Sequence, residues 1–378
     1  MSLRHFSRRK FLRDVAAGST GAALATIPSN LAAHDGSAVA ASGGPVTMES
    51  YPLVEPGKAP AVTRLKIVTR DGIPKTTEEY VRGLSSAVDL KVSEGDGEFH
   101  SELADADAIF GGLSRDDFAA ARRLKWIQYP AAGVEEIMWP ELVESPVVLT
   151  NMQRMYSPTI SESVIGLLLT LARGLNKYAL QTRESTWRPV EGLREISGMT
   201  MGLVGMGGIG TDTAYRAHYG FHMKVLGVDP KPLPKPVFVA ELHSLDWLAQ
   251  MVPQVDVLVS AAPHTHLSEG MFNEAIFHAM KPTAYFINVS RGKLVDTPAL
   301  VRALKEGWIA GAALDVAYKE PLPPDEALWT AGNIIITSHS SARSQGSSDR
   351  SYALFAENVR RYVNGLPLLN VVDKKRGY

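Results

Sequence analysis

Short apolar runs alternate with longer amphipathic stretches over most of the chain. In the first part this pattern predicts strands at residues 65–68, 87–92 and 108–110, and helices at 77–84 and 115–123. Beyond residue 200 it predicts strands at 201–204, 224–229, 255–260, 284–288, 311–316 and 333–337, and helices at 211–219, 245–251, 272–280 and 300–305. Because strands that alternate with helices are typical of parallel sheets covered by helices, the predicted fold class is α/β.

One long helix is predicted between these two series. It begins at Pro158, with Ser157 as its N-cap, and apolar residues recur along it at helical spacing, which indicates core packing. After residue 229 four prolines fall within residues 230–236, so we expect a stiff loop there.

Length and composition limit the possible functions. The chain has 378 residues, enough for two domains, and is 45% hydrophobic and 21% charged, which suits a large core. Its formal net charge is −1, which argues against nucleic acid as a partner. It has no cysteine, so disulfides and thiolate metal sites are excluded.

The first forty residues look like an export signal. Arg8 and Arg9 are followed by Phe11 and Leu12, and residues 15–27 are weakly apolar and rich in small side chains. This resembles a bacterial twin-arginine signal, which predicts a periplasmic protein; the alternatives are an organellar transit peptide or a cytoplasmic protein with a chance basic N-terminus. The apolar run is too short for a stable membrane anchor. Residues 41–61 read as an extended linker.

A glycine-rich turn follows the strand at 201–204. Gly205, Gly207 and Gly210 fit the pattern G-x-G-x-x-G, and Asp229 ends the next strand about twenty residues later. Such a turn lets a pyrophosphate approach the backbone and the helix N-terminus, and the acid can accept hydrogen bonds from a ribose. The predicted cofactor-binding residues here are Gly205, Gly207, Gly208, Ile209, Gly210 and Asp229.

Polar side chains gather where the later strands end. In an open α/β sheet the ligand lies beyond the carboxyl ends of the strands, where the sequence places Asn288, Arg291, Asp315, Glu320 and His339. A cation, a carboxylate and an imidazole would thus converge on one side of the cofactor. His264 and His266 have no evident third ligand, so no metal site is predicted.

Several long motifs, in order, are similar to the signatures of the D-isomer-specific 2-hydroxyacid dehydrogenases. They are Asn288-x-x-Arg291-Gly292-x-x-Val295-Asp296, then Gly311-Ala-Ala-Leu-Asp315 with Glu320-Pro321, then Leu328-Trp329 and His339. The resemblance covers residues 65 to 378. It implies an NAD-dependent oxidoreductase, with NADP less favoured, that moves a hydride between a D-2-hydroxy acid and its 2-keto form.

The resemblance also assigns roles to residues. Arg291 would bind the substrate carboxylate, His339 would be the acid/base, and Glu320 would orient His339. The backbone of Ala132 and Gly133 would hold the carboxylate, and Thr265, Asn288 and Asp315 would lie near the cofactor. Residues 62–157 with 342–378 would form the substrate domain and 158–341 the nucleotide domain, two Rossmann-like or flavodoxin-like parallel-sheet domains with an interdomain cleft, in a homodimer.

The chain departs from the family pattern at three positions: Gly208 replaces a basic residue, Ser163 a histidine, and Ser340 a glycine or alanine. Two alternatives stay open. One is a phosphite-type dehydrogenase on the same scaffold, since Glu320 argues only against formate. The other is a dinucleotide-sensing binding protein with little turnover, against which the export signal and the neutral charge argue.

Overall fold

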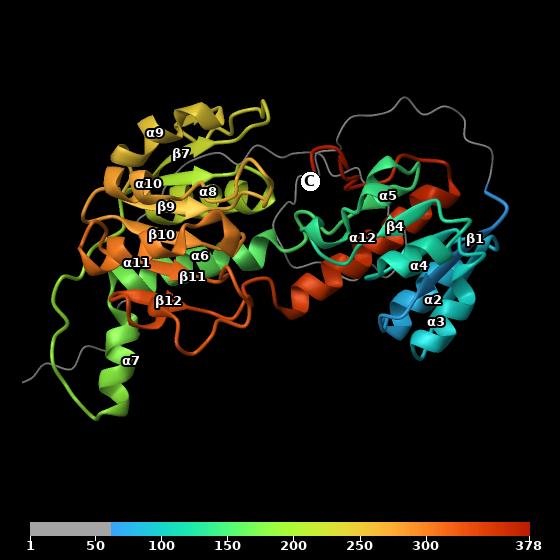
Figure 1. Cartoon of the computed structure of the whole chain (residues 1–378), viewed down its shortest axis with the longest axis horizontal. Helices are drawn as coiled ribbons and strands as arrows, with labels where there is room; N and C mark the ends of the chain where they lie inside the picture. Colours follow the sequence, from blue (N-terminus) through green and yellow to red (C-terminus); the bar gives the residue numbers. More distant parts are fainter. Residues whose placement is uncertain (1–61) are drawn as a thin grey trace, which may run out of the picture. The chain divides into compact units, whose positions relative to one another are not determined.

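The computed structural model describes residues 62–378, and the predicted export signal and linker lie outside them. Two sheets, both entirely parallel, account for the strands of this part of the chain (Figure 1). The α/β prediction is confirmed, because strands and helices alternate through both sheets.

The first sheet has five strands in the order β2-β1-β3-β4-β5. They are β1 (Leu65–Thr69), β2 (Val88–Val92), β3 (Ala108–Phe110), β4 (Trp126–Gln128) and β5 (Val148–Thr150). The associated helices are α2 (Lys75–Gly83), α3 (Asp96–Leu103), α4 (Arg115–Ala120) and α5 (Pro140–Glu144). Helix α4 ends three residues before the predicted boundary, and α3, α5, β4 and β5 were not predicted.

The C-terminal helix α12 (Gln345–Val363) packs against the first sheet. The ring of Phe355 stacks on Phe110 at 4.1 Å between centroids. The buried Asn358 donates from Nδ2 to Gln128 Oε1 at 2.8 Å, and its own Oδ1 accepts the N–H of Leu369 at 2.8 Å. The segment that follows α12 is thereby fastened to the sheet that residues 65–150 build.

The second sheet has seven strands in the order β12-β11-β10-β9-β6-β7-β8. They are β6 (Thr200–Val204), β7 (Lys224–Val228), β8 (Glu241–His243), β9 (Val257–Ser260), β10 (Tyr285–Asn288), β11 (Gly311–Leu314) and β12 (Ile334–Ile336). Its helices include α8 (Gly208–Phe221), α9 (Leu248–Met251), α10 (Glu274–Ala279) and α11 (Thr297–Lys305). The strand order reverses between β6 and β9, which is the position where doubly wound sheets bind ligands.

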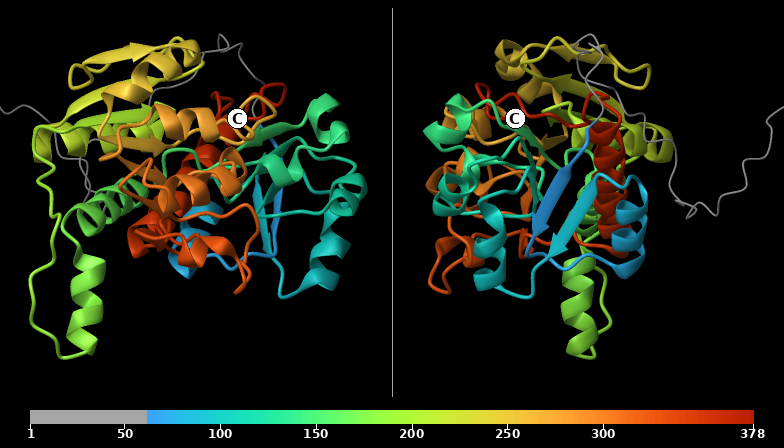
Figure 2. Two further views of the ribbon diagram at one scale, coloured as in Figure 1. Left: turned by 60° about the vertical axis from the view of Figure 1, so that its left-hand side comes forward. Right: turned by 90° about the vertical axis from the view of Figure 1, so that its right-hand side faces the viewer.

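The long helix α6 (Ser157–Ala172) packs on α8, and buries Val164 and Leu168 in the core of the second sheet. The predicted N-cap is wrong: Tyr156 has φ −97° and ψ −3°, so it already lies near helical geometry and Ser157 is the first helical residue, without a capping hydrogen bond. Helix α7 (Leu175–Arg183), which was not predicted, stands away from the second sheet (Figure 2). No helix within residues 62–378 combines the length and apolar character that a membrane span needs.

Candidate active site

The glycine turn after β6 has the geometry that a dinucleotide needs. Gly205 has φ +95°, and a Cβ there would lie 2.7 Å from the carbonyl oxygen of Ala261, so only glycine fits without strain. A Cβ on Gly210 would overlap the Gly205 carbonyl, so this glycine lets α8 close on the turn. Around Gly207, by contrast, a Cβ would enter open space. The turn therefore presents bare backbone at the N-terminus of a fourteen-residue helix, where anions are favoured.

Asp229 follows β7 and is held rigidly beside this turn. Its Oδ2 accepts the N–H of Met206 at 2.8 Å, and its Oδ1 accepts the N–H of Lys231 at 2.8 Å. The Lys231 ammonium lies 4.2 Å from the centre of the Tyr378 ring. Burial lowers the pKa of Lys231, against the opposing effect of the Asp229 charge. One carboxylate thus marks the end of β7, as the sequence pattern indicates.

The loop after β10 positions Arg291. The buried Asn288 donates from Nδ2 to the Arg291 carbonyl at 3.0 Å, and its Oδ1 accepts the backbone N–H of Ser290 at 3.0 Å. Gly292 allows the next loop to press closely on this one, because a Cβ there would overlap the backbone of Ala317. The side chain of Asn288 therefore fixes the backbone of residues 290–291 through these hydrogen bonds.

The Arg291 side chain meets the loop that follows β4. A Cβ on Gly133 would overlap the Arg291 guanidinium, so the two groups are in contact. Glu135 forms an ion pair with Arg291 through Nε, and a third of each side chain is exposed. Sequence reasoning placed Gly133 and Arg291 in one site but missed Glu135, for which the only signal was an acid two residues after the glycine.

The loop of Ala132 and Gly133 is anchored from behind. Asn151 donates from Nδ2 to the carbonyl of Ala132 at 2.6 Å, and the N–H of Met152 donates to Ala131 at 3.0 Å. Nearby, burial raises the pKa of the Tyr129 hydroxyl, and the Glu136 and Glu135 carboxylates raise it further. The site thus combines one arginine with two acids.

His339 and Glu320 form a hydrogen-bonded pair. The His339 Nδ1 lies 2.7 Å from Glu320 Oε2, and Glu320 Oε1 accepts the backbone N–H of Ala317 at 2.9 Å. His339 has φ 51°, in the left-handed region that non-glycine residues rarely adopt and that is common at functional sites. With Nδ1 engaged, Nε2 is the ring nitrogen left to face a substrate.

Asp315 holds the histidine loop. Its backbone carbonyl accepts the N–H of His339 at 2.7 Å. Its carboxylate accepts the N–H of Ser340 at 3.0 Å, the N–H of Ser341 at 3.1 Å and the hydroxyl of Thr337 at 2.5 Å. Asp315 is only 3% exposed, so its charge is used to fix the backbone that carries His339.

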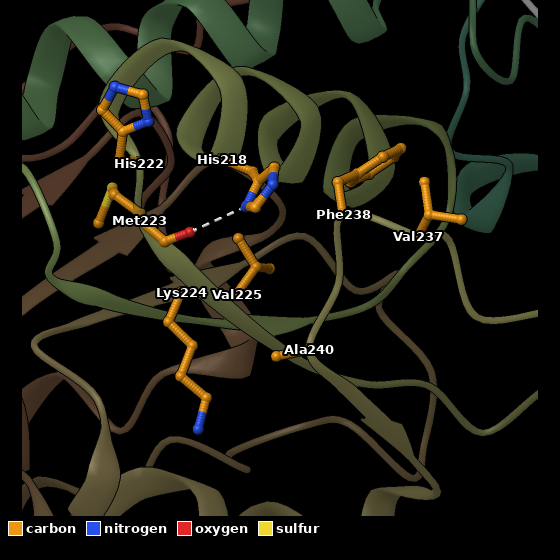
Figure 3. Close-up of a pocket in the computed structure, with 8 residues that line it drawn as sticks. All are labelled: His218, His222, Met223, Lys224, Val225, Val237, Phe238 and Ala240. Carbon is orange, nitrogen blue, oxygen red and sulfur yellow. Dashed lines mark hydrogen bonds between the residues drawn. The ribbon is translucent and has the colours of Figure 1, made fainter.

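Thr265 lies in the loop after β9, where its N–H donates to Ser268 Oγ at 2.8 Å. His264 Nε2 lies 3.4 Å from Glu269, and no group of three or more metal-ligating side chains occurs within residues 62–378. A hollow of about 380 Å³ lies elsewhere, between the end of α8 and the start of β7, where His218, His222 and Phe238 line it (Figure 3). This hollow lies at the amino end of β7, whereas the residues described above lie beyond the carboxyl ends of the strands.

Comparison with known proteins decides the family. Residues 165–341 match the profile of the D-isomer specific 2-hydroxyacid dehydrogenase NAD-binding domain. The chain is 33% identical over 284 residues to a glyoxylate reductase of Korarchaeum cryptofilum, covering 72% of this chain and 84% of that protein. The chain belongs to the D-isomer specific 2-hydroxyacid dehydrogenase family. As a member, it is an oxidoreductase that transfers hydride between 2-hydroxy and 2-keto acids with a nicotinamide dinucleotide.

Solved structures of this dehydrogenase family share the fold. One from Xanthobacter autotrophicus Py2, in complex with NADPH and MES, aligns with a TM-score of 0.73 at 26% identity, over 83% of this chain and 100% of that chain. A glyoxylate/hydroxypyruvate reductase from Sinorhizobium meliloti, in complex with NADP and sulfate, aligns with a TM-score of 0.72 at 27% identity, over the same shares.

Proposed function

We propose that this dehydrogenase reduces a small 2-keto acid to the D-2-hydroxy acid, with Arg291 binding the carboxylate and His339 delivering the proton. The observation that carries the proposal is the His339–Glu320 pair at 2.7 Å, held to the carboxyl ends of β11 and β12. The Arg291 loop presses on the Glu320 loop at Gly292, which supports the assignment of Arg291, Glu320 and His339 to one site.

The proposal gives each side chain a task. The planar guanidinium of Arg291 binds a carboxylate through paired N–H donors, and the absence of a side chain at Gly133 lets that guanidinium lie against the loop after β4. His339 gives the proton from Nε2 to the carbonyl oxygen in reduction and takes it back in oxidation. Glu320 fixes the orientation of the ring through its contact with Nδ1.

The residues of the glycine turn fit a nicotinamide dinucleotide. The open backbone at Gly207 and the free N–H groups of α8 would hold the pyrophosphate, and Asp229 would hold a ribose. When bound, the cofactor supplies or accepts the hydride. Thr265, Asn288 and Asp315 would lie at its nicotinamide end, as the family resemblance implies.

We further propose NAD as the preferred cofactor. The two solved relatives hold NADP(H), but in this chain the fixed Asp229 carboxylate would repel a 2′-phosphate. Lys231 is adjacent and works in the opposite direction. A comparison of kcat/KM for NADH and NADPH at equal ionic strength tests this: a ratio above one supports the proposal, and a ratio below one contradicts it.

The test of the reaction is a substrate panel. Purified protein is mixed with NADH and glyoxylate, pyruvate, hydroxypyruvate or phenylpyruvate, and the configuration of each chiral product is determined. Turnover to the D-product, lost in His339→Gln and Arg291→Gln, supports the proposal. Binding of NADH without turnover of any 2-keto acid would favour a sensor, and oxidation of phosphite with NAD would favour the phosphite-type reaction.

We also propose export by the twin-arginine route, on the basis of Arg8 and Arg9, the Phe11-Leu12 that follows them, and the weakly apolar residues 15–27. Free dinucleotide is scarce outside the cytoplasm, so the enzyme would fold around its cofactor before export and keep it. Mass spectrometry of nucleotide released from protein purified from the periplasm tests this. An empty protein confined to the cytoplasm would contradict it.

A homodimer is the proposed assembly, supported by the exposed apolar side chains on and after α7. Leu180 is 60% exposed and Trp187 fully exposed, on a segment that stands away from its sheet (Figure 2). Large apolar side chains with this much exposure would be covered in a dimer interface. Light scattering with size separation should give twice the chain mass for the wild type, and a lower mass for Leu180→Asp with Trp187→Ser.

A further inference from the structure

A segment that is distant in sequence lies on the first residue of α8. A Cβ built on Gly208 would lie 2.8 Å from Arg154 Cγ and 3.1 Å from Arg154 Cα, and would overlap the hydroxyl of Ser157. Residues 154–157 therefore occupy the space that a side chain at position 208 would need, and only glycine fits there. Because Gly208 opens the helix whose N-terminus faces the pyrophosphate, these residues stand at that site too.

Ser157 brings a buried hydroxyl to this place. The residue is 5% exposed, and its Oγ has no hydrogen-bond partner in the part of the chain that the structure describes. A buried polar group without a partner is costly and points to a group that binds there. An anionic oxygen at the start of α8 is an acceptor of the required kind.

Arg154 brings a cation to the same place. Its φ is 72°, a left-handed conformation that side-chain-bearing residues adopt at a cost and that clusters at ligand sites. The Cγ atom lies over Gly208, and the three further bonds of the side chain allow the guanidinium to reach the open face above Gly207. Guanidinium groups bind phosphate oxygens through paired donors.

We infer that Arg154 and Ser157 form the side-chain half of the pyrophosphate site, an assignment that rests on the proposed dinucleotide function. The glycine turn supplies backbone N–H groups only, and Gly208 carries no side chain. Arg154 contributes the positive charge and Ser157 a hydroxyl donor, both from the loop that precedes α6. The cation thus comes from outside the nucleotide-binding helix.

Binding measurements without any keto acid test the assignment. Titration calorimetry follows NADH, ADP and adenosine with the wild type, Arg154→Gly, Arg154→Lys and Ser157→Ala. Arg154→Gly should weaken NADH and ADP about tenfold or more, because a phosphate contact is lost, and leave adenosine within about twofold. Arg154→Lys should keep most of the affinity, and Ser157→Ala should lose about threefold for ADP.

Two controls separate the contact from a folding effect. Glycine adopts φ 72° readily, so Arg154→Gly should melt at nearly the wild-type temperature. Lys224→Gln removes the same charge at the amino end of β7, whereas the proposed site lies beyond the carboxyl ends of the strands. This variant should leave the affinities for NADH, ADP and adenosine unchanged.

The outcomes distinguish this assignment from the proposed function. If the wild type binds NADH and ADP, and Arg154→Gly binds both equally well, the assignment is wrong while the dinucleotide function stands. Equal loss of ADP and adenosine in Arg154→Gly would also overturn it, because the phosphates would then not be what Arg154 recognises. A wild type that binds neither NADH nor ADP would overturn both.

Discussion

Glu135→Gln should strengthen substrate binding. In the structure the Arg291 guanidinium is already paired with the Glu135 carboxylate. A 2-keto acid that uses Arg291 must therefore displace this acid or share the cation with it. The glutamine keeps the shape of the side chain and one acceptor oxygen, so Arg291 stays supported while the competing charge is removed.

The magnitude follows from two contributions. Two charges about 4 Å apart attract by ~4 kcal/mol at an effective dielectric of about 20, but solvent screens a partly exposed pair to about 1 kcal/mol. A substrate carboxylate on Arg291 would lie about 6 Å from Glu135, where repulsion costs about 0.7 kcal/mol in a water-like dielectric. Their sum of about 1.7 kcal/mol corresponds to a KM lower by roughly 10- to 20-fold.

Steady-state kinetics with saturating NADH measures the effect. The KM for glyoxylate should fall in Glu135→Gln, with kcat within about twofold, and the difference should shrink at high salt, where charges are screened. Glu136→Gln is the matched control, because it removes the same charge one residue away, from the acid beside Tyr129. An unchanged or higher KM in Glu135→Gln would show that Glu135 positions Arg291 and does not compete with the substrate.

Three further changes have predicted outcomes. Glu320→Gln should lower kcat about 10- to 100-fold with little change in melting temperature, since the charge that supports His339 is lost, and parallel kinetics and thermal melts check this. Asp315→Asn should lower both kcat and the free energy of unfolding, the latter by about 2 kcal/mol, because an amide would face buried N–H groups; denaturant unfolding measures it. Hydrogen bonds from Lys66 and Arg64 lower the pKa of Asp105 to about 2. Because this pKa lies below the unfolded value of about 3.9, the Asp105 carboxylate stabilises the folded protein at any pH above the unfolded pKa. The free energy of unfolding that Asp105→Asn loses should therefore be constant from about pH 7 to 5 and vanish between about pH 4 and 2. Denaturant unfolding at each pH measures it.

The buried strands could be predicted because parallel strands covered on both faces are continuous apolar runs. This holds for β6, β9 and β10, which are bounded by glycine or polar turns. The edge strand β8 was not predicted, because Glu241–His243 is short, polar and half exposed. Helix α7 was not predicted for a related reason: its leucines are exposed, so the sequence shows no apolar stripe that packs on a core.

Part of the candidate site could be predicted because parallel strands bring their carboxyl ends to one edge. That rule, with the family motifs, indicated Arg291, Glu320 and His339. Contacts between loops far apart in the sequence left no such pattern. Glu135 meets Arg291 across 156 positions, and Arg154 covers Gly208 because of a left-handed turn that no residue preference announces. The prediction of Ser157 as the N-cap was wrong because α6 begins at Ser157, one residue before Pro158.

The most direct test of the account follows a labelled hydride. The enzyme is incubated with pyruvate and NADH that carries deuterium at both C4 positions, and the lactate is analysed for deuterium at C2 and for configuration. We predict D-lactate that carries one deuterium at C2 in the wild type, and none formed by His339→Gln above background. L-lactate, product without deuterium, or full activity in His339→Gln would contradict the account.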